Sequence, residues 1–486
     1  MDKRIFRIFY VLLIFLVIIN INMISAGEIE QTTDSFSQDV LSDSTEIDQL
    51  NSTDDAAISD LKTNDEDSNL KADANAQEVS ETIEAGDSSQ INEDTVLDTP
   101  KPALKKAYLT AKVFVIKGDY LEVNLKDSSN KGIANEKVAL RLNGKTHSAI
   151  TNSKGIAKFK INEAGKTYKT IMKFYGNSIY KTTNKTFNLR VIGKPIYAKI
   201  TLASHGVIVN KTLKIYLKTK AGKAISKHSI LVSFDGRTYN KTTNKNGLAT
   251  LKINRKSKLY DLVVKYYGKG NYVPTGITTK INVFNSKLIG KNSNGKVYFQ
   301  GIIGNRSSKI KIAYVVGLHP PEHKAHEYVY KVLTNKINMR YKYYIYKIDV
   351  TKKSGEYSTD RMRGQILAKN YIVPHAKKQN FKLVIDIHST SGKTYAKTYF
   401  IHVPKNKHAP SMKLAKKTIA TIKKIEPNSK MLYWSPPTQT SPPYIHLPLI
   451  KAGVPTFVFE TWTYEKKSVT NKRAKILTTA VDKIFG

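Results

Sequence analysis

Two stretches in the middle of the chain, 104–193 and 196–284, repeat one another, and this repeat restricts the fold more than any other feature of the sequence. Four short motifs recur at a constant offset of 92 residues. The matched pairs are 141–144 with 233–236, 151–155 with 243–247, 160–162 with 252–254, and 174–176 with 266–268. Between Gly and Asn turns, apolar residues alternate with small or polar ones, as they do in half-buried strands. The repeat predicts two copies of one all-β unit.

The size of the repeated unit indicates which all-β fold it has. Short strands over about ninety residues, with no helical stretch, are typical of an immunoglobulin-like sandwich. Over almost their whole length the two repeats resemble the immunoglobulin-like modules of bacterial and archaeal surface adhesins. This resemblance implies display or adhesion and no chemistry of their own.

The N-terminus has the layout of a secretory signal. Lys3, Arg4 and Arg7 precede an apolar run over 8–24, and Ser25 and Ala26 provide small residues at a cleavage point. We expect residues 1–26 to be removed and the protein to be secreted, at the cell surface or in the cell wall. The alternative is an uncleaved N-terminal anchor, because the run approaches the length of a membrane span.

Charge divides the rest of the chain. Residues 27–100 hold 21 acids against two lysines, a net charge of −19, and their composition predicts a disordered acidic linker. Residues 101–486 have a net charge of +57. A body this basic is expected to adhere to an acidic envelope polymer or glycan, unless its charge only serves solubility. The sequence contains no recognised nucleic-acid motif, so we expect no specific nucleic-acid partner.

From residue 286 to 486 the pattern changes to alternating strands and helices. Strands are predicted at 309–316, 341–349, 382–387 and 456–459, and helices at 322–335, 358–373, 410–424 and 469–485. Several of the strands are continuously apolar, like buried parallel strands. The expected fold is an α/β domain with a mainly parallel or mixed sheet, and function in such domains collects at the carboxyl ends of the strands.

Potential metal ligands follow two of these strands. The chain contains no cysteine, so a metal site must use His, Asp or Glu. His319 and Glu322 come after the first strand, and His388 comes directly after the third. Two His and one Glu leave a fourth position on zinc for water, so we expect a single Zn²⁺.

The residues of the first cluster also match a second zinc-binding motif. Residues 319–323 match H-x-x-E-H, which needs both histidines on one face of a continuous helix. Pro320 and Pro321 lie between these histidines, and proline is tolerated only at a helix start. His319 is therefore assigned to a turn and Glu322 to the first helical turn, which leaves His323 and His326 as surface residues.

At these residues the chain resembles the zinc carboxypeptidase superfamily, in particular its succinylglutamate desuccinylase and aspartoacylase branch. The pattern His-x-x-Glu followed by a distant His is met by His319, Glu322 and His388, and 455–461 resembles the strand that ends in the catalytic Glu of the family. The resemblance implies that Glu460 moves the protons of the hydrolysis. The alternative for Glu460 is a carboxylate paired with a lysine.

Family members also bind the substrate with arginines and a loop tyrosine. The candidates for these roles are Arg361, which would bind the substrate's carboxylate and stabilise the oxyanion, Arg363 and Tyr444. Where the family commonly has Asn-Arg, this chain has Asp360-Arg361, which puts specificity for a free terminal carboxylate in doubt. The alternatives are surface charges for the two arginines and plain packing for the tyrosine.

Together these features predict an exported zinc peptidase or amidohydrolase that acts on peptide of the cell envelope. The competing hypothesis is a surface adhesin whose C-terminal domain keeps the hydrolase fold only for binding. The presence of every expected ligand and of the catalytic Glu favours catalysis.

Overall fold

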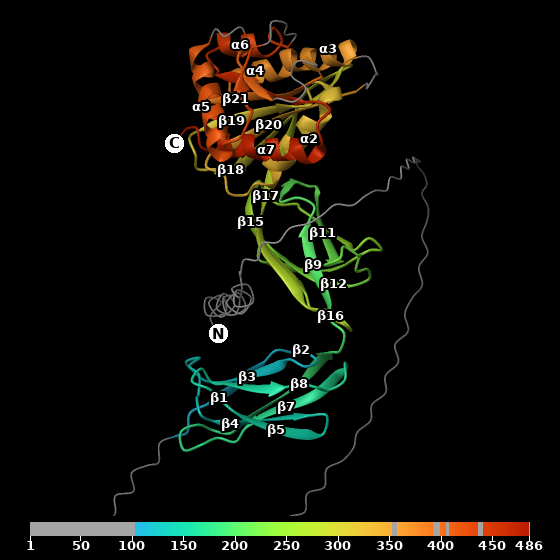
Figure 1. Ribbon diagram of the computed structural model, residues 1–486, viewed down its shortest axis with the longest axis vertical. Helices are drawn as coiled ribbons and strands as arrows, with labels where there is room; N and C mark the ends of the chain where they lie inside the picture. Colours follow the sequence, from blue (N-terminus) through green and yellow to red (C-terminus); the bar gives the residue numbers. More distant parts are fainter. Residues whose placement is uncertain (1–102, 352–356, 392–398, 405–407, 436–440, 486) are drawn as a thin grey trace, which may run out of the picture. The chain divides into compact units, whose positions relative to one another are not determined.

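The computed structural model describes residues 103–351, 357–391, 399–404, 408–435 and 441–485 (Figure 1). The predicted signal over 1–26 and the acidic linker over 27–100 lie outside these residues. Among the described residues, no helix combines the length and the apolar character needed to span a bilayer.

The first repeat is built from two sheets. One sheet has the order β1-β3-β6, and the other has the order β2-β8-β7-β4-β5. The strands are β1 (Ala107–Ala111), β2 (Phe114–Ile116), β3 (Tyr120–Asp127), β4 (Lys137–Leu142), β5 (Lys145–Ile150), β6 (Ile156–Lys160), β7 (Thr167–Phe174) and β8 (Thr183–Ile192). The apolar residues that alternate along these strands form one shared core. This is a β sandwich, as the pattern of the sequence predicts.

The second repeat has the same topology. Its sheets have the order β14-β11-β9-β16 and β13-β12-β15-β17, with β10 paired to β17. The strands are β9 (Ile196–Leu202), β10 (Gly206–Ile208), β11 (Thr212–Thr219), β12 (Ser229–Phe234), β13 (Arg237–Thr242), β14 (Leu248–Lys252), β15 (Lys258–Tyr266), β16 (Tyr272–Val273) and β17 (Thr275–Asn292). Leu213, Ile215 and Leu217 on β11 are buried, 92 positions after the equally buried Leu121, Val123 and Leu125 on β3.

The hairpin turns show why the first motif recurs. Asn143 and Gly144 have φ values of 50° and 76°, and Asp235 and Gly236 have 50° and 71°. A two-residue turn with both residues at positive φ fits the twist of the flanking strands, and it favours Asn-Gly or Asp-Gly. The repeated motif is thus the turn chemistry of β4–β5 and of β12–β13.

The C-terminal part contains one mixed sheet. Its strand order is β18-β20-β19-β21-β24-β22-β23. These strands are β18 (Gly295–Gly304), β19 (Lys311–Val316), β20 (Lys342–Val350), β21 (Leu383–Thr390), β22 (Phe400–His402), β23 (Leu432–Tyr433) and β24 (Thr456–Trp462). β20, β19, β21 and β24 run parallel, whereas β18 is antiparallel to β20, and β22 is antiparallel to β24 but parallel to β23. β17 pairs with β15 over its first half and with β18 over its second, so it belongs to both sheets.

Helices pack on both faces of this sheet. They are η1 (Pro320–Glu322), α2 (His323–Asn335), α3 (Tyr357–Leu367), the π-helical η2 (Ala368–Ile372), α4 (Val373–Lys377), α5 (Ala409–Ile425), α6 (His446–Lys451) and α7 (Lys467–Val481). α2, α5 and α7 contribute to one core, and the segment from α3 to α4 contributes with α6 to the other. The expected end of the second helix near 373 is wrong, because the chain passes through η2 and α4 with Pro374 in the first turn of α4. α6 has no counterpart among the predicted helices.

Candidate metal centre

The carboxyl ends of β19, β21 and β24 bring the candidate site together. Because these strands are parallel neighbours, the residues that follow them meet at one edge of the sheet. After β19 the chain turns sharply at Gly317, whose φ is 85°. A Cβ there would lie 2.2 Å from the carbonyl oxygen of Ile348, so only glycine fits this turn. The turn delivers His319 and then η1, where Pro320 and Pro321 occupy the first positions as predicted.

His319, Glu322 and His388 form a buried cluster. Nδ1 of His319 lies 2.9 Å from Oε1 of Glu322, and Nδ1 of His388 lies 3.0 Å from its Oε2. One ligand atom from each residue lies within 4.8 Å of the others, and each of the three residues is at most 2% exposed. Within the part of the chain that the structure describes, no other group of three such residues meets this condition. The cluster could hold a metal ion.

The far side of each imidazole ring is anchored. Nε2 of His388 lies 2.8 Å from Oδ2 of Asp386, and Nε2 of His319 lies 3.2 Å from the side-chain nitrogen of Gln365. A half turn of the Gln365 amide presents its oxygen instead, which can accept a proton from Nε2. A histidine that binds metal through one ring nitrogen usually donates its other N–H to a carboxylate or carbonyl. The donor set and its supports therefore fit a cation.

The pKa values of His388 and Glu322 show which charges the cluster favours. Burial favours the neutral form of His388, but Asp386 and Glu322 outweigh it and hold the pKa of His388 well above its usual value. Burial likewise opposes ionisation of Glu322, yet His319 and His388 keep the pKa of this carboxyl well below its usual range. The cluster thus stabilises a positive charge on the imidazole of His388, whereas burial lowers the pKa of His319.

The sequence analysis does not identify three supporting residues, which are Gln365, Asp386 and His446. Asp386 stands two positions before His388, and Oδ2 of Asp386 also lies 3.0 Å from Nε2 of His446 in α6. Asp386 and His446 are fully buried. The alternation of strand β21 is a signal that could have found Asp386, because residues two apart face the same side. Nothing local in the sequence connects His446 to it.

Glu460 lies on the neighbouring strand, directly opposite His388. The register of β21 and β24 pairs these two residues, and register partners face the same side of a sheet. Oε2 of Glu460 is enclosed without a hydrogen-bond partner among the described residues, and burial raises the pKa of this carboxyl to about 8. No lysine of the described part forms an ion pair with Glu460, so the structure does not support the lysine-paired alternative. A carboxyl with a pKa near neutrality suits proton transfer.

The arginines occupy different places. Arg361 contacts the cluster, with Nη1 3.1 Å from Oε1 of Glu322, and its side chain is 22% exposed. Arg363 is half-buried, and its Nε has no hydrogen-bond partner among the described residues. The side chain of Asp360 lies outside what the structure describes. Arg361 is therefore the arginine that the structure brings to the cluster.

Tyr444 stands two positions before His446 in the sequence. Its backbone N–H donates to the carbonyl of Ser441, and its side chain is half-buried. No described contact joins its hydroxyl to the cluster, and residues 436–440 of the same loop lie outside the described part. Its role in substrate binding stays a prediction.

His323 and His326 were both expected on the surface. His323 is exposed, but the prediction for His326 is wrong. Nε2 of His326 lies 2.8 Å from the carbonyl oxygen of Ile387, and burial lowers the pKa of this imidazole to about 4. Because His326 stands on the inner face of α2, it donates this bond to the residue before His388.

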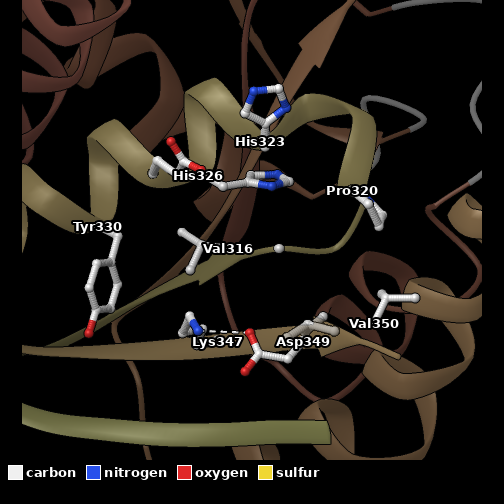
Figure 2. Close-up of a pocket in the computed structure, with 11 residues that line it drawn as sticks. Val316, Pro320, His323, His326, Tyr330, Lys347, Asp349 and Val350 are labelled. Carbon is white, nitrogen blue, oxygen red and sulfur yellow. Dashed lines mark hydrogen bonds and ion pairs between the residues drawn. The ribbon is translucent and has the colours of Figure 1, made fainter. Parts of the chain in front are cut away.

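A separate cavity of about 670 Å³ lies between α2 and β20. His323, His326 and Tyr330 line it from α2, and Figure 2 shows the ion pair of Lys347 and Asp349 on the opposite side. None of the three cluster residues lines this cavity. It is therefore distinct from the candidate metal centre.

Comparisons with known proteins give distant similarities. No family model and no curated protein matches the chain. Among solved structures, the chain is similar to a candidate metallopeptidase from Shewanella denitrificans, with 9% identity, a TM-score of 0.29, and coverage of 41% of this chain and 82% of that one. It is similar to the tripeptide-bound cell shape determinant Csd4 from Helicobacter pylori, with 10% identity, a TM-score of 0.27 and coverage of 35% of this chain. The match spans 50% of the Csd4 chain. Fibronectin(III)-like modules of CbhA from Clostridium thermocellum match with 15% identity, a TM-score of 0.20, and coverage of 36% of this chain and 93% of theirs.

Proposed function

We propose that residues 286–486 form a zinc-dependent hydrolase that cleaves an amide bond in peptide of the cell envelope. The observation that carries this proposal is the convergence of His319, Glu322 and His388, with Glu460 opposite His388 on the next strand. Two imidazoles and one carboxylate form a ligand set that leaves a position open for water.

The chemistry divides between the ion and the protein. When bound, Zn²⁺ supplies Lewis acidity and lowers the pKa of a water molecule. Glu460 takes a proton from the attacking water on its carboxylate and delivers it to the nitrogen of the leaving amine. Burial raises the pKa of this carboxyl, which favours its role as the proton donor to the leaving amine. Arg361 contributes a planar set of donors beside the cluster, which suits an oxyanion or a substrate carboxylate.

The proposed location rests on the sequence. The signal-like segment over 1–26 supports export, and the net charge of +57 over 101–486 supports association with an acidic envelope. Peptide cross-bridges of a wall polymer are substrates that such an enzyme would meet.

One observation favours the non-catalytic alternative. Arg361 already forms an ion pair with Glu322, so a guanidinium satisfies one oxygen that a metal would use. If this pair persists in solution and excludes the metal, the C-terminal part would lack the proposed hydrolase activity. Metal content therefore decides between the two functions.

The test measures zinc and hydrolysis on the same samples. The full chain, dialysed against Zn²⁺ and then against metal-free buffer, is expected to keep one zinc and to release amines from wall-derived peptides. His388→Ala should lose both, because it removes one of three ligands. His323→Ala is the matched control, since this exposed histidine follows Glu322 directly and should leave both unchanged.

Glu460→Gln separates catalysis from metal binding. This variant should keep its zinc and lose about 10²–10⁴ in kcat, the usual contribution of a positioned acid or base. Loss of zinc from Glu460→Gln would make Glu460 a ligand and remove its assigned role. Hydrolysis by a metal-free preparation would refute the proposed function as a whole.

A further inference from the structure

One face of the second repeat carries lysines and tyrosines but no carboxylate. It is the outward face of β9, β11 and β14, called here the β9–β11–β14 face. Its members are Tyr197, Lys199, Thr201, Thr212, Lys214, Tyr216, Lys218, Leu248, Thr250 and Lys252. Four of these side chains are cationic, two are aromatic, and none is a carboxylate.

The lysines of this face lack local counter-charges. Lys218 on β11 stands directly opposite Lys199 on β9, and like charges in that position destabilise a sheet. In the described part of the chain, no carboxylate forms an ion pair with Lys199, Lys214, Lys218 or Lys252. The fold therefore holds a repulsive pair that an external anion would relieve.

The first repeat shows that the shared fold does not require this arrangement. On the corresponding strands of that repeat, Glu122 forms an ion pair with Lys158 at 3.2 Å. The positions 92 residues later are Lys214 and Thr250, which are again directly opposite each other. The second repeat thus has a cation where the first has an anion.

The other sheet of the second repeat differs as well. There Asp261 on β15 pairs with Lys280 on β17, so cation and carboxylate stand together. The β9–β11–β14 face contains no such pair within the described part of the chain.

The aromatic residues indicate what kind of anion fits. Tyr216 lies between Lys214 and Lys218 on one strand, about 7 Å from each along the strand axis. The ammonium of Lys218 is 5.4 Å from the centre of the Tyr216 ring, and that of Lys220 is 4.9 Å from the centre of the Tyr197 ring. Asn124 occupies the place of Tyr216 in the first repeat, so the ring is not needed for the fold either.

A tyrosine ring offers a flat surface to the C–H face of a sugar ring, while ammonium groups on both sides pair with carboxylates. We propose that the β9–β11–β14 face binds an anionic polysaccharide whose sugars carry carboxylates. This binding goes beyond the proposed hydrolase function and does not depend on it.

The probe is polygalacturonate, titrated into the full chain at fixed ionic strength. Two comparison polymers separate the contribution of the sugar rings from that of the charge. Methyl-esterified polygalacturonate has the sugars without the charge, and polyphosphate has the charge without the sugars. The wild-type chain is expected to bind polygalacturonate more tightly than either.

Two variants give the second repeat the residues of the first. Lys214→Glu should lower the affinity for polygalacturonate about tenfold, because it reverses one charge beside the ring. Tyr216→Asn should lower it about threefold or more without any change of charge. Lys265→Glu is the matched control, since it makes the same charge change on β15 in the opposite sheet and should have a much smaller effect.

Thermal unfolding midpoints verify that the variants fold. Equal losses in Lys214→Glu and Lys265→Glu would overturn the proposal in favour of diffuse attraction by net charge. Equal binding of polyphosphate, together with unchanged affinity in Tyr216→Asn, would overturn it in favour of a phosphate polymer. Zinc content and peptide hydrolysis should remain at wild-type levels in all three variants, so failure here is distinguishable from failure of the hydrolase proposal.

Discussion

Asp386 shows how a single residue can act on the candidate metal centre without belonging to the ligand set. Its carboxylate lies between Nε2 of His388 and Nε2 of His446 and contacts both. A proton held on Nε2 of His388 leaves the lone pair of Nδ1 directed at the cluster. Asp386 therefore selects the form of His388 that can bind a metal.

Asp386→Asn tests this role. The amide keeps the size of the side chain but loses the charge that stabilises the imidazole, so zinc affinity should fall about 10–100-fold. Competition with a chromophoric chelator measures this change. Gln379→Glu, a change of similar size in the turn after α4, is the control and should leave affinity unaltered. Unchanged zinc affinity in Asp386→Asn would mean that Asp386 only fills space.

The raised pKa of Glu460 makes the stability of the metal-free protein depend on pH. Burial raises the pKa of this carboxyl from the ordinary value of about 4.3 in an unfolded chain to about 8 in the folded protein. Between these two values the folded state holds a proton that the unfolded state releases. The contribution of Glu460 to stability is thus present below pH 4 and is lost as the pH rises towards 8.

Glu460→Gln removes this dependence, because glutamine does not titrate. In metal-free buffer the variant should unfold at a higher temperature than wild type at pH 8, by about 2 °C or more, and the difference should shrink towards pH 5. Differential scanning fluorimetry across this range measures it. A difference that grows towards low pH would contradict the raised pKa.

At the scale of elements, α3 is positioned by one glycine. A Cβ on Gly364 would lie 1.7 Å from the backbone oxygen of Leu318, immediately before His319. Helix propensity alone predicts that Gly364→Ala stabilises α3 by about 1 kcal/mol. The contact predicts the opposite, because α3 would have to move away from the turn that carries the first ligand.

Gly364→Ala should therefore lower the free energy of unfolding by about 1–3 kcal/mol and weaken zinc binding as well. Urea unfolding and zinc titration measure the two effects. Met362→Ala, a change at an exposed position of the same helix, should leave both close to wild type. Stabilisation by Gly364→Ala would show that α3 does not pack closely on this turn.

The sequence predicts local elements well and their contacts poorly. The turn at Asn143 and Gly144 and the four parallel strands follow from patterns within a few residues, and the structure contains them. The predicted helix end at 373 is wrong, because the chain continues through the π-helical η2 and through α4 as far as Lys377. The predicted surface position of His326 is wrong because its environment depends on which side of α2 packs against β21. The contact of His446 with Asp386 joins residues 60 positions apart, which no local pattern can show.

At the scale of the whole molecule, metal binding should distinguish the C-terminal part from the repeats. The first repeat, the second repeat and the α2 face of the C-terminal sheet each have a separate hydrophobic core. All three proposed ligands lie in the C-terminal part, so zinc stabilises only the folded form of that part. A ligand at about a thousand times its dissociation constant adds about 4 kcal/mol to stability.

Calorimetry of the full chain should show more than one transition, and zinc should raise one of them by about 8–16 °C, as expected for a part of about 200 residues. The transition of the first repeat should stay in place, because that repeat contributes no ligand. His388→Ala should abolish the shift and leave the other transitions unchanged, whereas Lys214→Glu should retain it. An equal shift of every transition would mean that zinc binds diffusely to the chain, and the absence of any shift would remove the metal centre from the C-terminal sheet.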